Sequence, residues 1–458
     1  MFETVRRPTV SANATDCHWP CNSARILAAL TIILILSATV IFFSGTIETL
    51  GKNIPQKNLT TDYAIALVWA LALGASILIW PVPGTVKKAL LILWSAKMLV
   101  VLVAMLAYEA YYPFLDAYSY FNVPREIDYE WAGFSVGQGT ENIYSAVWLY
   151  YKIMPESYHA LKASFAVLGL IAVYLFYRAA VIFLGRDDVR ILYVLGLFPS
   201  VLFWSSIIGK DPLVLLAIAF YVLGVVGWYR LNRVRYLLIG IGGIAMAVLV
   251  RSWLGPIMVA PLLLLLMLRV RGPLTKTVLA VLGGAALLAL MKGLLGDFGL
   301  ESYSDVLVTI DTIARLWSEH GGSGQEITWD FTDISQVLSF VPLGMFTALF
   351  RPLPGEVLNP FGWLAGFENA VLLALCGRAV LRTRFRELRD PIVLWAVSFV
   401  IVWAIVYGFA SYQNLGTAVR FKLQVLPILL GLLFYFGRRR SAMVPSSDAC
   451  SITSASQR

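Results

Sequence analysis

Long apolar runs, separated by short polar or charged segments, follow one another along most of this chain. A helix needs about 20 apolar residues, within a range of about 17–25, to cross the hydrocarbon core of a bilayer. Some runs are short, as expected for tilted helices or a locally thinned bilayer. The pattern predicts about 12 membrane-spanning helices. The predicted spans are residues 26–43, 64–80, 89–107, 160–184, 191–208, 212–228, 236–250, 256–268, 277–295, 359–376, 391–409 and 421–436.

Clusters of basic residues between the runs predict how the helices are oriented, because cytoplasmic loops carry an excess of Lys and Arg. With an even number of spans, every cluster lies on the cytoplasmic side together with both termini. The clusters comprise Arg6, Arg7 and Arg25; Lys87 and Lys88; Arg186 and Arg190; Arg230, Arg233 and Arg235; Arg269, Arg271 and Lys276; Arg378, Arg382, Arg384, Arg386 and Arg389; and Arg438, Arg439 and Arg440.

One further apolar run, residues 336–350, would place the basic cluster at 378–389 outside if it crossed the bilayer. We therefore predict that this run is re-entrant or interfacial, with residues 351–354 returning on the outer side. Non-helical backbone at that depth is tolerated where protein buries it or where it lines a cavity. The alternative is thirteen spans with an inverted C-terminal half.

Composition agrees with a membrane protein. Hydrophobic residues make up 59% of the chain and charged residues 14%, whereas soluble domains have roughly 25% charged residues. The net charge of +9 is explained by the clustered loop residues, so we expect no nucleic-acid partner. The predicted fold class is an all-α polytopic membrane protein with about 12 transmembrane helices and one re-entrant or interfacial segment.

The predicted organisation has a cytoplasmic tail (1–25), a transmembrane domain (26–436) and a disordered cytoplasmic tail (437–458). Two outer loops, 108–158 and 296–335, are long, and loops of this length are usually functional. Within the first, residues 141–153 have the pattern of an amphipathic helix lying on the membrane surface.

Asp116 is the first candidate for chemistry, because it follows the third span and is flanked by aromatic residues. A partly desolvated carboxylate there could act as a general base or hold a cation, although a solvated loop acid fits the position as well. Asp128 and Glu130, in the same loop, are candidates for a second acid or cation ligand. Loops of this length also carry such charges without a catalytic role.

A second candidate lies at 198–212, where an aromatic, apolar run ends in Lys210 and Asp211 and Pro212 begins the next helix. Charges in hydrocarbon cost several kcal/mol, so these two residues belong at a membrane surface or in a polar cavity. Lys210 could bind a phosphate as a point charge. The alternative is an ion pair that closes a hairpin, with Asp211 in a supporting role.

Arg251 and Arg420 lie at outer helix ends and break the positive-inside pattern. A bound phosphate or pyrophosphate would explain them, since the guanidinium fork binds phosphate oxygens bidentately. Snorkelling to lipid headgroups is the alternative. Arg351 joins these residues in a supporting role if the 336–350 run returns to the outer side.

Common cofactor motifs are missing from the sequence: there is no Walker A pattern, no dinucleotide-binding glycine motif and no His-Glu-x-x-His. The three histidines lack partners at metal-ligand spacing, so we expect no zinc site. Whether Asp116 and a second loop acid hold a divalent cation is left open.

Four segments together resemble bacterial membrane glycosyltransferases of the GT-C superfamily, as found in exopolysaccharide and O-antigen assembly. The resemblance covers most of the chain, with Asp211 standing where Glu is more usual. The family's acidic pair in the first loop is incomplete here, so its partner for Asp116 stays ambiguous. The segments are Asp116-Ala117-Tyr118-Ser119-Tyr120, 198–212, 350–356 with Phe367-Glu368-Asn369, and 414–427.

The resemblance implies an inverting enzyme of the cytoplasmic (inner) membrane that uses a polyprenyl-phosphate-linked sugar and a glycan, lipid or protein acceptor. Asp116 matches the base, and Lys210, Arg251 and Arg420 match carrier-phosphate ligands. Two alternatives remain: an O-antigen or exopolysaccharide polymerase or ligase, and a transporter or flippase of lipid-linked sugars. A transporter predicts mid-span charges and inverted repeats; Lys97 is deep in its span, but no repeat is visible.

Overall fold

The computed structural model describes residues 31, 38, 40–131, 133–297, 308, 309, 311, 312, 324, 325 and 329–438. Most of the predicted span 26–43, both predicted tails and most of the loop 296–335 lie outside these residues. All regular elements of the described residues are helices, and one isolated β-bridge joins Gly324 to Asn414. The predicted all-helical class is confirmed for this part of the chain.

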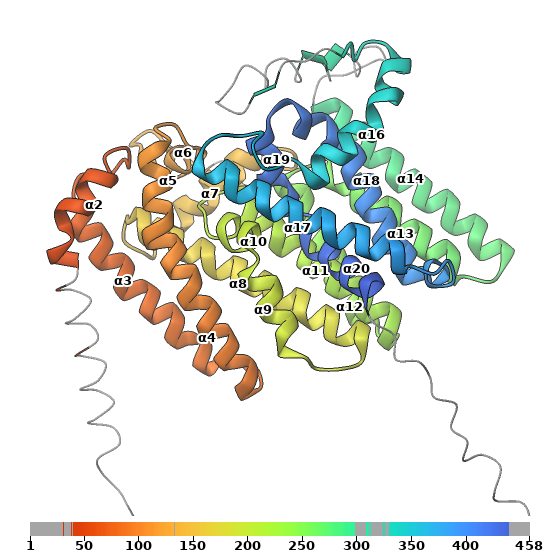
Figure 1. Ribbon diagram of the computed structural model, residues 1–458, viewed down its shortest axis with the longest axis horizontal. Helices are drawn as coiled ribbons and strands as arrows, with labels where there is room; N and C mark the ends of the chain where they lie inside the picture. The colour runs from red at the N-terminus through yellow and green to blue at the C-terminus, as the bar shows by residue number, and fades with distance from the viewer. Residues whose placement is uncertain are drawn as a thin grey trace, which may run out of the picture.

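Seven of the predicted runs form helices long and apolar enough to cross a membrane (Figure 1). Their lengths follow from sequence, because no proline or charge cluster interrupts them for about 20 residues. They are α3 with its 3-10 extension (Leu59–Ser76 and Ile77–Ile79), α4 (Gly84–Leu99) continued by a π-helical stretch (Val100–Ala104) into α5 (Met105–Tyr111), α8 (Tyr158–Leu184), α11 (Lys210–Leu231), α14 (Pro273–Asp297), α17 (Pro360–Arg382) and α18 (Pro391–Gln413).

The remaining predicted spans that the structure describes, 191–208, 236–250, 256–268 and 421–436, form shorter helices, as does the run 336–350 that was predicted to be re-entrant or interfacial, so about 12 full spans are not established. Three apolar helices have only 16 or 17 residues, about 24–26 Å at 1.5 Å per residue. They are α12 (Val234–Val250), α13 (Leu254–Arg269) and α16 (Ile334–Phe350). The last predicted span is preceded by a separate helix, and α19 (Leu415–Lys422) and α20 (Leu426–Gly437) are bent by 71°.

The prediction of a single span at 191–208 is wrong. The structure has two short helices there, α9 (Val189–Leu197) and α10 (Pro199–Trp204). Phe198 between them has an extended backbone (φ −61°, ψ 125°), because a following proline disfavours the helical conformation. The chain then turns through residues 205–209 and enters α11.

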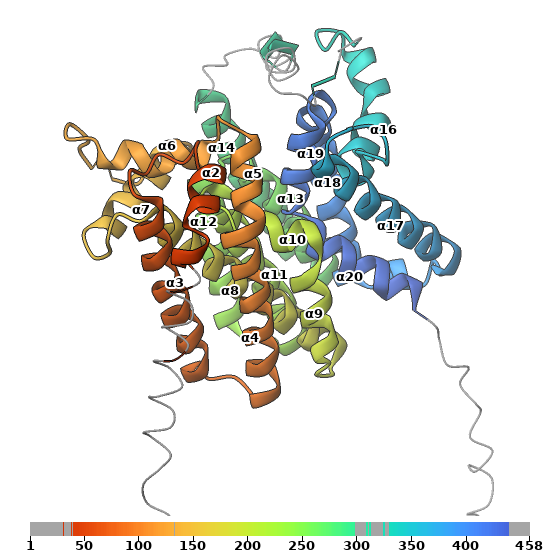
Figure 2. The same cartoon turned by 60° about the vertical axis from the view of Figure 1, so that its left-hand side comes forward.

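The predicted first outer loop, 108–158, contains two helices. The segment Asp116–Asn122 forms α6, and α7 (Gly139–Tyr151) covers most of the predicted amphipathic helix at 141–153. The run at 336–350 forms α16, which packs against α18 and α19. In Figures 1 and 2, the start of α17 lies near the same end of the molecule as α16.

The two ends of α11 define two ends of the bundle. Its 22 residues extend about 33 Å, close to the roughly 30 Å of a bilayer's hydrocarbon core. Lys210 and Asp211 begin the helix, and Arg230 lies in its last turn. We call the end with Lys210 the site end and the other the arginine-rich end. Contacts that join the turns of the arginine-rich end are Arg230 to Asp390 (3.6 Å), Arg269 to Asn232 (2.7 Å) and Arg438 to Glu387 (2.8 Å).

The main hydrophobic core surrounds α11. The apolar stretch of α11 is 78% buried, against 6% for α14, which lies at the periphery. Small residues bring α12 close to α11, and a Cβ on Gly224 would lie only 2.4 Å from the Gly240 backbone. The central position of α11 fixes the place of Lys210 and Asp211 at its start (Figure 2).

Candidate functional site

The candidate site lies where the turn before α11 meets α6, α7 and α19. Gly209 ends this turn with φ +147°, a conformation that L side chains rarely adopt. A Cβ on Gly209 would lie 3.2 Å from the ring of Tyr120 on α6. Glycine at this position therefore lets the backbone pass close to the Tyr120 ring just before Lys210 and Asp211 begin α11.

Asp211 is the buried centre of the site. Its side chain is 1% exposed and accepts hydrogen bonds from two arginines that are distant in sequence. Arg251 Nη2 donates to Oδ1 at 3.1 Å, and Arg420 Nε donates to Oδ2 at 2.5 Å. A buried carboxylate needs such partners, because charge without them is strongly penalised in the interior.

Asp116 lies at the exposed side of the same arginine. Arg420 Nη1 donates to Asp116 Oδ2 at 2.9 Å, and the Asp116 side chain is 61% exposed. Arg420 thus bridges one buried and one accessible carboxylate, across sequence separations of 209 and 304 residues. The cap of α19 supports this position, since Asn414 Oδ1 accepts from the amides of Gly416 and Thr417.

Thr140, which had no sequence signal, and Tyr120, from the aromatic segment beside Asp116, complete the site. Lys210 Nζ donates to the hydroxyl of Thr140, in the first turn of α7, at 2.8 Å. Tyr120 packs its ring against Tyr144 of α7, with the centroids 5.7 Å apart. Burial, together with the negative charge of Asp116, raises the pKa of the Tyr120 hydroxyl, which keeps it a neutral donor.

The charges of the site favour an anion. Lys210, Arg251 and Arg420 carry three positive charges, and Asp116 and Asp211 carry two negative charges. Arg251 Nη1 is buried and has no hydrogen-bond partner among the described residues. A buried guanidinium with an unused donor, in a site with excess positive charge, can donate a hydrogen bond to a phosphate oxygen.

The other predicted residues lie apart from this group. Arg351 pairs with Glu356 at 2.8 Å, and it donates to Gln325 at 3.2 Å. Asp128 and Glu130 are exposed in the segment between α6 and α7, and no ion pair within the described chain joins them to the site. Their proposed roles as a second acid remain predictions. Within the described ranges, no group of three or more His, Cys, Asp or Glu side chains is placed to hold a metal ion.

Contacts among α10, α17 and α19 form a support next to the site. Glu368 on α17 accepts the Ser200 amide at the start of α10, at 2.7 Å. Lys422, at the end of α19, donates to Asn369 and, at 3.3 Å, to the Arg351 carbonyl. These contacts tie α17 and α19 to the helix that precedes the 205–209 turn.

Lys97 holds the same turn from the other side. It is 1% exposed, and its Nζ donates to Ser205 Oγ at 2.5 Å, the Ser205 carbonyl at 3.2 Å and Ser206 Oγ at 3.1 Å. Lys97 lies in α4, so a residue deep in a predicted span fixes the backbone that carries Gly209 and Lys210. The sequence showed its depth but gave no sign of its partners.

A second buried charged group anchors the helices that lead into α6. Lys162 Nζ lies 2.9 Å from both Glu109 carboxylate oxygens, and the Tyr158 hydroxyl donates to Glu109 at 2.7 Å. Asp62 hydrogen-bonds His159 Nδ1 and accepts the Tyr158 amide at 2.8 Å. These pairs join α3, α5 and α8 at the site end.

Among the described residues, all regular elements are helices, and seven of them, or eight if the bent pair counts as one span, are long and apolar enough to cross a membrane. The fold therefore defines the class as a helical membrane protein. In comparisons with known proteins, no family model, no curated protein and no solved structure matches this chain.

Proposed function

We propose that this protein is a membrane glycosyltransferase that moves a sugar from a polyprenyl-phosphate carrier to an acceptor hydroxyl. We place the reaction at the outer face of the cytoplasmic membrane, in surface polysaccharide or glycolipid assembly. The observation that carries the proposal is the convergence of an accessible carboxylate, Asp116, with Lys210, Arg251 and Arg420 at one end of a bundle of apolar helices.

In the proposed reaction, Asp116 accepts the proton of the acceptor hydroxyl while the hydroxyl oxygen bonds to the anomeric carbon. The bond between that carbon and the carrier phosphate breaks, and the phosphate leaves with the electron pair. Because this leaving group is already a stable anion, the protein has to supply positioning and charge stabilisation. The resemblance to GT-C enzymes implies inversion at the sugar.

The positive groups have different parts in this scheme. Arg251 has an unpaired Nη1, and Lys210 donates to the hydroxyl of Thr140, which a phosphate oxygen can replace as the acceptor. Arg420 is already shared between two carboxylates, so it orients Asp116 toward the anion. Asp211 keeps the two arginines together at the bottom of the site.

The experiment is sugar transfer in membranes that contain the protein and are supplied with polyprenyl-phosphate-linked sugars. We expect Asp116→Asn to lower transfer about 10²–10⁴-fold at unchanged expression, the usual contribution of a general base. Glu141→Gln is the matched control, because it neutralises an exposed acid of the same predicted loop that has no ion pair to Arg420.

Full transfer by Asp116→Asn would show that another acid is the base. Elongation of lipid-linked oligosaccharides without transfer from monosaccharide carriers would identify a polymerase instead. Movement of lipid-linked sugar across the bilayer without a new glycosidic bond would identify a transporter.

A further inference from the structure

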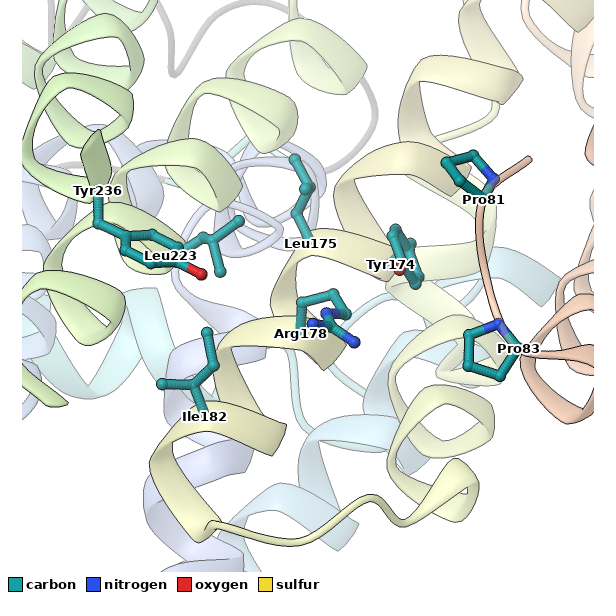
Figure 3. A pocket seen from close by; sticks show the side chains of 8 residues that line it. All are labelled: Pro81, Pro83, Tyr174, Leu175, Arg178, Ile182, Leu223 and Tyr236. Atoms are coloured by element: carbon teal, nitrogen blue, oxygen red, sulfur yellow. The ribbon is translucent and has the colours of Figure 1, made fainter. Parts of the chain in front are cut away.

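A cavity lies at the arginine-rich end of the bundle, beside the C-terminal part of α8. The candidate site lies at the other end of the bundle. It has a volume of about 260 Å³ and is bounded by α8, α11, α12 and the turn between α3 and α4 (Figure 3). Arg178 is its one charged lining residue, and the hydroxyl-bearing side chains are Tyr174 and Tyr236. Leu175, Ile182 and Leu223 form its apolar part.

Arg178 has an unusual position for a charge. It precedes the end of α8 at Leu184 by six residues, about 9 Å. The 27 residues of α8 extend about 40 Å, roughly 10 Å more than a hydrocarbon core. Arg178 is therefore near the boundary between hydrocarbon and headgroups, where a charge calls for a specific partner.

The described protein does not supply that partner. No hydrogen bond or ion pair joins Arg178 to another described residue, and the nearby acid Asp187 accepts the Tyr177 hydroxyl instead. Figure 3 shows Arg178 among the lining side chains, with its guanidinium on the side that faces Tyr174 and Pro83. A half-buried guanidinium that lines a cavity and has no hydrogen-bond or ion-pair partner among the described residues indicates an anionic ligand.

The surroundings of the cavity indicate a lipid. Exposed apolar side chains flank it on both sides: Leu78 (57%) and Ile79 (83%) precede Pro81, and Val234 (68%) and Leu238 (64%) surround Tyr236. In a membrane protein such side chains face acyl chains, so the cavity lies between two lipid-facing surfaces. Lys87 and Lys88, near the start of α4 and beside the α3–α4 turn, fit a cytoplasmic leaflet with anionic lipids.

We propose that this cavity is a binding site for an anionic phospholipid of the inner leaflet. The lipid phosphate pairs with Arg178, the tyrosine hydroxyls are within reach of headgroup oxygens, and the glycerol and upper acyl segments pack on Leu175, Ile182 and Leu223. The site is independent of the proposed transferase activity and lies at the other end of the bundle. A bound lipid would join the α3–α4 turn to α8 and α12.

The test uses the purified full-length protein in a neutral detergent, with lipid binding followed by native mass spectrometry and by the thermal unfolding midpoint. The probes are phosphatidylglycerol, phosphatidylcholine and inorganic phosphate. We expect phosphatidylglycerol to bind at least about tenfold more weakly to Arg178→Gln, which loses a charge-assisted contact. Arg186→Gln is the matched control: it removes one charge from an exposed site in the next turn, and we expect it to bind as the wild type does.

Arg178→Lys keeps the charge and should retain most binding. Ile182→Trp fills the apolar part of the cavity, keeps Arg178 and should weaken binding as well. It therefore still tests the site if Arg178→Gln fails to fold. Equal phosphatidylglycerol binding by Arg178→Gln and Arg186→Gln would overturn the proposal. Equal binding of phosphatidylcholine would overturn the requirement for an anionic lipid, and Arg178-dependent stabilisation by inorganic phosphate alone would show a free-anion site instead.

Discussion

Two carboxylates share the guanidinium of Arg420. Because they differ in burial, we expect replacement by Asn to affect stability at one and activity at the other. Asp211 is 1% exposed and also pairs with Arg251, whereas Asp116 is 61% exposed and pairs with Arg420. We expect Asp211→Asn to lower stability strongly, and Asp116→Asn to change stability little while it lowers sugar transfer about 10²–10⁴-fold.

The magnitudes follow from exposure. Asp211→Asn leaves Arg251, whose side chain is 5% exposed, close to Arg420 without a counter-charge between them. Breaking a buried pair in this way costs about 3–5 kcal/mol. The exposed pair between Asp116 and Arg420 contributes at most about 1 kcal/mol, because water screens it.

The assay compares unfolding free energies of wild type, Asp116→Asn and Asp211→Asn in the same micelles, beside sugar transfer at a temperature where all three are folded. Asp211→Ala, which also removes the hydrogen-bonding amide, should be at least as unstable as Asp211→Asn. Equal stability of the two Asn variants would refute the reasoning, since it would mean that burial does not distinguish the two carboxylates. A stable Asp211→Asn variant would likewise refute the buried arginine pair.

Two further predictions concern the framework of the site. Gly209→Ala should lower the free energy of unfolding by about 1–3 kcal/mol, because φ is +147° and the new Cβ meets the Tyr120 ring. The control is Gly242→Ala, on the open surface of α12, which should be neutral or slightly stabilising. Equal effects of the two substitutions in thermal unfolding would contradict this prediction. Lys162→Met should cost about 3–5 kcal/mol by leaving Glu109 buried and unpaired, and adding Glu109→Gln should recover most of that loss. Simply additive losses in this double-mutant cycle would argue against the pair.

The sequence by itself determined the helical class and much of the location of the long helices. Seven predicted runs coincide with long helices, since an apolar segment of about 20 residues needs no knowledge of its neighbours to be recognised. It also singled out Asp116, Lys210, Asp211, Arg251 and Arg420. A charge at the end of an apolar run is visible in sequence because hydrocarbon penalises it wherever the helix packs.

Tertiary structure decided which of these charges meet. The contacts of Arg420 span 209 and 304 residues, and nothing in the sequence relates Thr140 to Lys210. The sequence also predicted a span that begins at residue 64, after Asp62, and a span that ends at residue 107, before Glu109. In the structure, α3 and the α4–α5 helix include these two acids. A hydropathy pattern treats each charge as facing lipid, whereas a buried partner such as His159 or Lys162 offsets that cost, and only the packing of the helices supplies the partner.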